Sequence, residues 1–539
     1  MFNDSSDSGQ ICALTPTAVL LPNKDKVLTR QMQQVPQTKS SSFGAQALNG
    51  GLWTALQVVV NKGVSMLGTL INLYLLSPRE VGIATVALST QSLIMVLPAF
   101  TMTDALIARP NSMRSLIPDA LKWCIWTSIP MIAAILAWGW WQAGMQHDGD
   151  YMRAAVVIAF RPVVDLFLFG PQTRLRSDLA FAVMARIDMV CFIGSTVLSV
   201  AMAAMGFGFI SILVPPIALT AVRALLYRTA DQVPHSQPTP GAPDADRAIM
   251  HEYLLSGLGQ YVHGGLIMVA PLILVYFFDE VVTGLFQNAY QLSAVINLIV
   301  ATGIGLVLQP IFAQMQGDLR RQQQAFIRSC SVIAAVAIPG CVCQAVLAGP
   351  ALRLILPEKW LGVIPMTVIM SIGMAFCFTA NPAMALLKAQ GRFTTFLIWQ
   401  SIQFVIVTLG MLLVGRTWPE AGPLPIVAVY GLYHIVMSPI GVFLCVRGSG
   451  LTGHAQLTIF ARPLLGTVAA LIPVGGLYWA LSFLPISWQR DMLTVLLAPT
   501  VMLLTYPSIL RYLDPANFLE CCKVLAPARH ALKRICTPQ

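Results

Sequence analysis

The sequence has very little charge. Only 10% of its 539 residues are Asp, Glu, Lys or Arg, while 56% are hydrophobic. A water-soluble domain carries about 25% charged residues, because polar side chains have to cover its surface. The shortage of charge therefore excludes an ordinary soluble fold. The hydrophobic residues also do not alternate with polar ones at every second position, which is the pattern of a membrane β-barrel strand. The expected fold class is all-α.

Further absences argue against enzyme chemistry. The eleven cysteines show no metal-ligand spacing, and most of them, such as Cys124 and Cys330, stand inside apolar blocks where Cys packs as a small hydrophobe. The sequence has no Walker motif and no catalytic constellation. The loops expected on the outer face are short, whereas a membrane glycan polymerase would need a sizeable outer loop. We expect no metal, no cofactor and no enzymatic activity.

What the sequence does contain is a series of long hydrophobic blocks. Each is long enough to cross a hydrocarbon core of roughly 30 Å as a helix. The blocks predict a polytopic membrane protein with about 14 transmembrane helices. They fall near residues 50–76, 82–108, 119–142, 152–172, 182–205, 207–228, 250–277, 282–308, 329–349, 360–382, 393–415, 424–446, 460–483 and 492–510.

Polar stretches between the blocks suggest a domain organisation. Residues 1–48 are rich in Ser, Gln, Asn and Thr and are expected to be a disordered cytoplasmic tail, in which Met32 is an alternative start to Met1. A proline-containing linker separates two lobes of six helices. The predicted segments are the tail 1–48, the N-terminal lobe 49–228, the cytoplasmic linker 229–248, the C-terminal lobe 249–447, helices 13 and 14 in 448–510, and a basic cytoplasmic tail at 511–539.

The distribution of basic residues predicts the orientation. Of the 33 Lys and Arg, 25 lie in the two terminal tails and every second loop, and two lie inside spans, Lys62 and Arg161. The remaining six lie in the opposite loops: Arg79, Arg153, Arg353, Lys359, Arg416 and Arg490. By the positive-inside rule, the richer set is cytoplasmic and both termini are inside. The spread of basic residues over many loops also explains the net charge of +10 without a nucleic-acid partner.

Two stretches resemble each other across the two halves. Ser77-Pro78-Arg79-Glu80-Val81-Gly82 corresponds to Asp279-Glu280-Val281-Val282-Thr283-Gly284, at an offset of 202 residues that also carries Asn61 onto His263. Internal duplication in a membrane protein is typical of a transporter whose site lies between the repeats. Both halves are expected to start in the cytoplasm, so the repeats are predicted to be parallel.

Several short motifs resemble the polysaccharide-repeat (Wzx-type) oligosaccharide flippases, which belong to the multidrug/oligosaccharidyl-lipid/polysaccharide exporter superfamily. Together they cover about residues 45–510, and the tail 1–48 has no counterpart in the family pattern. The motifs are LSPREVGIA at 76–84, ALIAR at 105–109, RSDLAF at 176–181, QGD at 316–318 and KAQGR at 388–392.

The resemblance implies two six-helix lobes around a central cavity. It also implies a substrate in the phospholipid bilayer, an oligosaccharide repeat unit on an undecaprenyl diphosphate carrier, flipped across the bacterial inner membrane for exopolysaccharide, capsule or O-antigen synthesis. The polysaccharide polymerase and export machinery are the expected partners. The alternatives are a cation-coupled multidrug antiporter or a lipid II flippase of the same superfamily, and a membrane glycan polymerase or glycosyltransferase.

A polar stripe on the first span supplies candidate substrate-binding residues. Gln57, Asn61, Ser65, Gly68 and Asn72 recur every three or four residues and so share one helical face. Lys62 lies at its edge near mid-span, where a charge costs roughly 2.5–3.5 kcal/mol, and is expected to face a wet cavity and an anionic diphosphate or acidic sugar. An interhelical structural contact is the alternative.

Other spans hold further candidates for the same cavity. Arg161 and Asp165 form an i,i+4 pair in the fourth span, which serves either as a cavity site or as a self-neutralising structural pair. The second half offers Gln260, His263, Gln291 and Asn297, which would bind sugar hydroxyls or hold helices together. Asp104, Asp188 and His434 are weaker candidates, for which loop or packing contacts suffice.

Overall fold

The computed structural model describes most of the chain, and within the described residues every regular element is a helix. The chain divides into two units, Met1–Asn49 and Gly50–Gln539, and the first is described only from Ser40. The described ranges are 40–95, 113–146, 148–177, 180–231, 264–296, 318–390, 392–446, 453–483 and 488–522, with residues 258, 261, 262, 308, 312 and 315.

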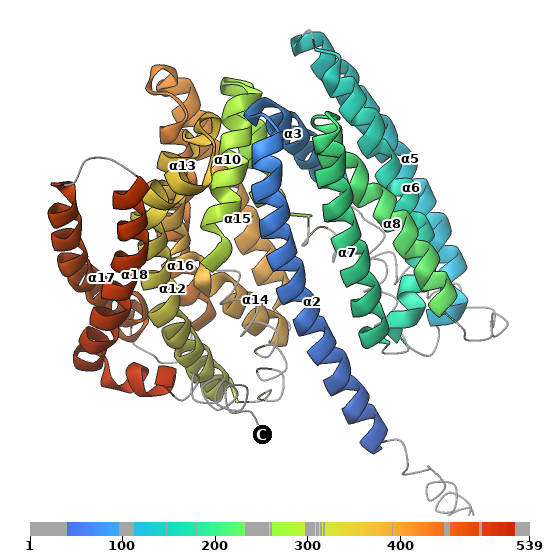
Figure 1. The fold of residues 1–539 in the computed structure, drawn as a ribbon. Helices are drawn as coiled ribbons and strands as arrows, with labels where there is room; N and C mark the ends of the chain where they lie inside the picture. The colour runs from blue at the N-terminus through green and yellow to red at the C-terminus, as the bar shows by residue number, and fades with distance from the viewer. Residues whose placement is uncertain are drawn as a thin grey trace, which may run out of the picture. The chain divides into compact units, whose positions relative to one another are not determined.

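Ten of the described helices are long and apolar enough to cross a membrane (Figure 1). This confirms the prediction of an all-α polytopic membrane protein. The ten are α2 (Ser40–Leu75), α5 (Met113–Gln146), α6 (Asp150–Ser177), α7 (Phe181–Ala204), α8 (Ile210–Ala230), α12 (Leu319–Ile355), α15 (Phe393–Thr417), α16 (Leu424–Val446), α17 (Gly453–Ser482) and α18 (Trp488–Leu513).

The other four predicted spans are described in part. The span at 360–382 is a bent pair: α13 (Val363–Met374) meets the segment Cys377–Leu387 at 48°. This segment consists of the 3-10 helix η3 (Cys377–Thr379) and most of α14 (Ala380–Ala389). The remaining three correspond to α3 (Pro78–Ile94), the helix Gly264–Phe277 and α10 (Glu280–Ser293). Each of these stands next to residues outside the described set, so the total of 14 spans stays a prediction.

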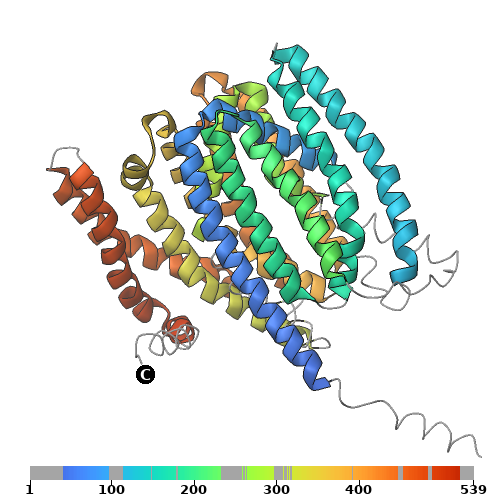
Figure 2. The same ribbon diagram turned by 45° about the vertical axis from the view of Figure 1, so that its right-hand side comes forward.

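The N-terminal half, α2 to α8, packs mainly through α6. This helix lies against α5, α8 and α3, and α7 lies against α8 (Figure 2). Tyr151, Ala154 and Ile158 of α6 are fully buried, in a cluster with Ile83 of α3 and Ile135 of α5. Small side chains such as alanine let helix backbones approach closely, which is how helices associate where lipid removes the hydrophobic driving force between them.

The C-terminal half, Gly264–Phe277 to α16, is built around α13. This helix packs against α10, α12 and α16, and its core includes Trp360, Met370 and Tyr430. Leu73, near the end of α2, joins the same cluster, so the last turns of α2 are packed against the C-terminal half.

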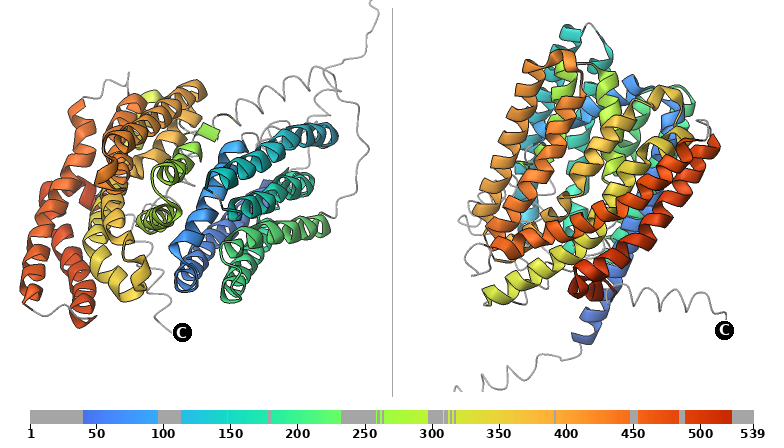
Figure 3. Two further views of the ribbon diagram at one scale, coloured as in Figure 1. Left: turned by 90° about the horizontal axis from the view of Figure 1, so that it is seen from above. Right: turned by 90° about the vertical axis from the view of Figure 1, so that its left-hand side faces the viewer.

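The two C-terminal helices form a hairpin on α12 (Figure 3). Arg353 of α12 donates two hydrogen bonds to Asp491 of α18, at 2.9 and 2.6 Å. Asp491 is buried, so this two-bond pair compensates the cost of taking its charge out of water. Two further ion pairs, Arg462–Asp514 and Arg328–Glu520, tie the hairpin and the segment after it.

Candidate functional site

The two repeats touch where α3 crosses α10. A Cβ added to Gly82 would lie 1.8 Å from the carbonyl oxygen of Glu280, and one added to Gly284 would lie 2.0 Å from that of Pro78. Pro78 and Glu280 are themselves related by the offset of 202 residues. The crossing is therefore reciprocal: each glycine meets the partner helix at the residue four positions before the other glycine. Only glycine leaves room for backbones this close.

Both crossing helices begin with a matching cap. Ser77 caps α3 in a capping box, in which its hydroxyl accepts from the backbone N–H of Glu80 and the Glu80 carboxylate accepts from the Ser77 N–H. Asp279, at the corresponding place, accepts from the N–H of Val282 at 2.8 Å. Such caps satisfy N–H groups that have no partner within the helix. They fix where α3 and α10 start, and so where the glycines meet.

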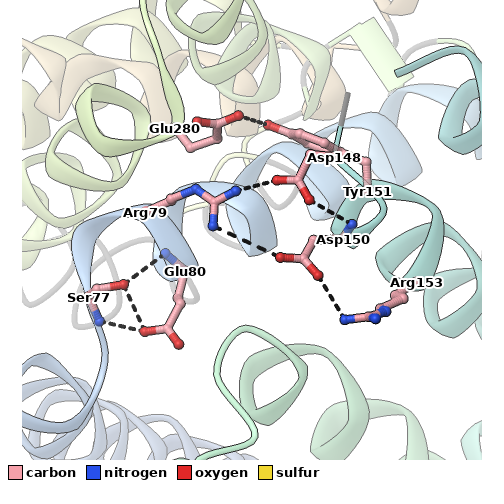
Figure 4. Close-up of polar contacts among 8 residues, drawn as sticks. All are labelled: Ser77, Arg79, Glu80, Asp148, Asp150, Tyr151, Arg153 and Glu280. Carbon is pink, nitrogen blue, oxygen red and sulfur yellow. Dashed lines mark hydrogen bonds and ion pairs between the residues drawn. The ribbon is translucent and has the colours of Figure 1, made fainter. Parts of the chain in front are cut away.

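The first turn of α6 and the residues just before it reach both halves at this crossing (Figure 4). Tyr151, which is fully buried, donates its hydroxyl hydrogen to the Glu280 carboxylate of α10 at 2.8 Å. Arg79 of α3 pairs with Asp148 and approaches Asp150 at 4.0 Å. One short segment thereby holds the start of α3 in its own half and the start of α10 in the other.

The loop between α12 and α13 makes the reciprocal contact. Lys359 donates to the carbonyl oxygens of Tyr74 and Leu76 at 3.1 and 2.7 Å, and the indole N–H of Trp360 donates to that of Leu73 at 2.7 Å. These carbonyl groups lie at the C-terminal end of α2, where no further turn of the helix supplies N–H donors for them. Together with the Tyr151–Glu280 bond and the Gly82–Gly284 crossing, these bonds form what is called the clasp below. All its parts lie at the same end of the helices.

The predicted polar stripe of α2 lies against α7. Gln57 donates to Asp188 at 3.4 Å, and Asn72 donates to Ser199 at 3.2 Å. Between them, a Cβ on Gly68 would lie 2.3 Å from the methyl group of Thr196. The side-chain oxygens of Asn61 and Asn72 are buried without a hydrogen-bond partner among the described residues. In this arrangement the stripe packs against a helix, and two of its acceptor oxygens have no hydrogen-bond partner among the described residues.

Lys62 is half-buried at the edge of this stripe, and among the described residues it has no hydrogen bond or ion pair. Arg161 and Asp165 contact each other as predicted, with both carboxylate oxygens 3.1 Å from the guanidinium Nε. Burial of a charge is costly unless a partner is near, and the i,i+4 spacing supplies one. The binding roles of these residues stay predictions.

Asp188 is the centre of a polar network that sequence reasoning ranked low. Besides Gln57, it accepts from the Tyr227 hydroxyl at 2.7 Å and from Arg223 at 3.4 Å. It thus joins α2, α7 and α8 inside the N-terminal half. An acidic residue near the end of a span is usually explained by loop contacts, and nothing in the local sequence identifies partners 35 and 39 residues away.

The candidates in the second half are described only in part. Gln291 of α10 is half-buried. Gln260, His263 and Asn297 lie outside the described residues. Sequence reasoning did not single out Tyr151, Glu280 or Trp360. The repeat offset was the available signal, because it aligned the start of α3 with the start of α10.

Comparison with known proteins agrees with this geometry. A family model described as polysaccharide biosynthesis protein matches residues 74–365, which include every residue of the clasp except Leu73. The fold is similar to an inward-closed structure of the lipid II flippase MurJ, 12% identical, covering 84% of this chain and 99% of that one with a TM-score of 0.58.

It is also similar to an inward-facing multidrug resistance MATE family transporter of the MOP superfamily, 12% identical, covering 74% of this chain and 96% of that one with a TM-score of 0.54. No curated protein sequence gives a significant match. The chain thus shares its fold with these two proteins. The chain belongs to the polysaccharide biosynthesis protein family, because the family model matches more than half of it.

Proposed function

We propose that this protein is a flippase that moves undecaprenyl-diphosphate-linked oligosaccharide repeat units across the bacterial inner membrane by alternating access. The observation that carries the proposal is the clasp: in a chain of a polysaccharide biosynthesis family, two repeats touch backbone to backbone at one end of their helices. A contact of this kind at one end of the helices allows a transporter to close one side of the membrane while the other side opens.

The positive-inside rule assigns the clasp to the outer face, because Arg79 and Lys359 belong to the sparse set of outer basic residues. This orientation puts both termini in the cytoplasm. The clasp then closes the space between the two halves on the outer side of the membrane. Reporter fusions test it: fusions after Arg114 and Gly317 should report cytoplasm, and one at Glu420 should report the outside. A swapped result for any of them contradicts the orientation.

The free energy needed to break the hydrogen bonds of the clasp is small enough for a transport cycle. Five hydrogen bonds join the two halves at this end: one from Tyr151, two from Lys359, one from Trp360, and one from the Tyr74 hydroxyl to the carbonyl oxygen of Ile355. Each contributes about 0.5–1.5 kcal/mol net, since water replaces the lost partner. The total is of the size that differential binding of a ligand supplies when it shifts a two-state equilibrium.

The cytoplasmic half of the N-terminal bundle suits an anionic head group. Among the described residues there, Arg161 pairs with Asp165 and Arg223 with Asp188, whereas Lys62 has no ion pair. The excess positive charge would be compensated by a diphosphate. The Gln57–Asp188 bond is long at 3.4 Å, so it is readily exchanged for a contact with substrate.

The main test is deletion of the gene. We expect surface polysaccharide to disappear and lipid-linked repeat units to accumulate in the inner leaflet, with both defects reversed by the wild-type gene. The polymerase and export machinery act on the flipped units, so removing the polymerase instead should leave repeat units in the outer leaflet. Normal appearance of repeat units at the outer leaflet after deletion, with no second flippase present, would refute the proposal.

The same strain separates the alternatives. A lipid II flippase is required for cell-wall synthesis, so its loss stops growth rather than removing surface polysaccharide alone. A multidrug antiporter changes drug susceptibility and leaves polysaccharide intact. The expected result is viable cells with unchanged drug susceptibility and no surface polysaccharide.

A further inference from the structure

The C-terminal half contains a partly open cavity of about 360 Å³ among the helix Gly264–Phe277 and α10, α12, α13, α14, α15 and α16. Pockets that hold small ligands start at about this size. It differs from the N-terminal interior in its chemistry: none of the described residues that line it is an Asp, Glu, Lys or Arg.

Aromatic rings make up much of its wall. Tyr430 stands between Tyr290 and Tyr433, with ring centroids 6.2 Å from each. Trp399 and Phe378 also line the cavity. The Tyr290–Tyr430 pair packs edge to face and the pair with Tyr433 is tilted, and rings held in this way are rigid apolar surfaces.

A few polar groups in the lining of the cavity also indicate a ligand site. His434 lines the cavity and is only 9% exposed, yet its Nε2 has no hydrogen-bond partner among the described residues. Gln403 accepts a hydrogen bond from the Tyr433 hydroxyl at 3.2 Å, and both residues line the cavity. A buried polar atom without a partner is rare enough to need an explanation, and one explanation is that the His434 ring turns toward the cavity when a ligand binds there.

We infer that this cavity is a subsite for an uncharged pyranose ring of the glycan that the flippase carries. A pyranose has an apolar C–H face that stacks on aromatic rings, and hydroxyl groups that both donate and accept hydrogen bonds. The diphosphate does not fit, since a charge buried without a counter-charge is strongly disfavoured. A metal cation lacks carboxylate ligands there. A hydrocarbon tail would leave His434 unsatisfied.

The inference rests on the proposed function for its choice of ligand. It assigns different tasks to the two halves: the N-terminal half receives the charged diphosphate, and the C-terminal half receives a neutral sugar. Such a division would explain why the repeats kept their crossing glycines while their interiors diverged.

The test uses the full chain in lipid nanodiscs free of glycoside detergent. Saturation-transfer NMR would be recorded with the methyl glycosides of glucose, galactose and mannose, and with methyl glucuronoside as the charged counterpart. We expect transfer to at least one neutral glycoside and none to the glucuronoside. His434→Phe keeps a ring of similar size but removes Nε2, and should weaken binding about five-fold, the effect of one hydrogen bond.

Thr408→Val is the matched control. Thr408 lies on α15 outside the cavity lining, and its hydroxyl is also buried without a partner among the described residues. It should bind the glycoside as the wild type does. Absence of transfer to every neutral glycoside, equal binding by His434→Phe, or loss of binding in Thr408→Val would each overturn the inference, the last because the effect would not be local.

Export assays separate the two proposals. If His434→Phe is as abundant as the wild type and exports poorly, both stand. If glycosides bind but gene deletion leaves polysaccharide export intact, the proposed function fails and the sugar site survives. If deletion abolishes export and no glycoside binds, the flippase stands and the sugar subsite fails.

Discussion

In the N-terminal half, Asp165 and Asp188 meet arginines inside the helix bundle, whereas in the C-terminal half His434 stands among tyrosines and glutamines that carry no charge. At their crossing, by contrast, the two halves are nearly interchangeable: Gly82 meets α10 as Gly284 meets α3. The comparison teaches that the repeats keep the contact that they make with each other and differ where each would face a substrate.

The largest effect is expected from substitutions at the crossing of α3 and α10, where the two halves are alike. Gly82→Ala and Gly284→Ala each place a methyl group about where a backbone carbonyl oxygen already stands. Relief requires the helices to separate, at a cost of about 3 kcal/mol or more for the closed arrangement. Both variants should abolish export to the same degree. The measurements are surface polysaccharide and hydrogen–deuterium exchange of residues 74–84.

Gly144→Ala is the control for this pair, because a Cβ there meets nothing within 4 Å. It should export normally, and its helix should gain about 0.5–1 kcal/mol. Export by either crossing variant at the wild-type level would show that α3 and α10 do not need this contact. A large difference between the two variants would show that the crossing is not functionally symmetric.

Lys62 tests the difference between the interiors, since its counterpart at the repeat offset is Gly264. Lys62→Ala should leave the protein inserted and abundant, because removing a mid-span charge relieves an insertion cost of roughly 2.5–3.5 kcal/mol. Export should fall about ten-fold or more, the effect of losing one charge-assisted contact with a diphosphate. Membrane abundance and surface polysaccharide are measured together.

Lys62→Arg keeps the charge and should retain more export, although its geometry differs. Normal export by Lys62→Ala would show that this lysine is only a tolerated structural residue. Loss of the protein itself would point to an ion pair in the folded state.

Asp188→Asn tests stability in the charged interior. The variant leaves Arg223 without its carboxylate and weakens the bond from Tyr227, so the free energy of unfolding should fall by about 1–3 kcal/mol. His434→Phe, in the uncharged interior, should change it little, because it removes a polar atom that has no partner among the described residues. Thermal unfolding of both in the same lipid gives the comparison. Equal losses would mean that the two interiors are not energetically different.

The smallest effect is expected at a single bond of the clasp. Tyr151→Phe removes the hydrogen bond to Glu280 and should weaken the closed state by about 1 kcal/mol, which is about a five-fold shift in population. Faster hydrogen exchange in residues 279–288 reports it. Tyr512→Phe, at an 86% exposed tyrosine, should leave exchange there unchanged. Unaltered exchange in Tyr151→Phe would remove this bond from the clasp.

The membrane class could be predicted from the sequence because it depends on local hydrophobicity. Backbone in lipid has to satisfy its own hydrogen bonds, so a long apolar block without a β-barrel pattern is a helix wherever it packs. The ten single-helix spans follow from this rule. The rule says nothing about where a helix bends, so the sequence predicted one continuous span at 360–382 and not the 48° break between α13 and the segment after it.

The repeat offset identified Gly82 and Gly284 as equivalent, but only the tertiary structure decided that they touch. The same holds for Tyr151 and Glu280, which are 129 residues apart, and for Trp360 and Leu73, which are 287 apart. Such pairs depend on how whole helices pack, which no local pattern records. Likewise the spacing of Gln57 and Asn72 placed them on one face of α2, while packing against α7 determined what that face meets.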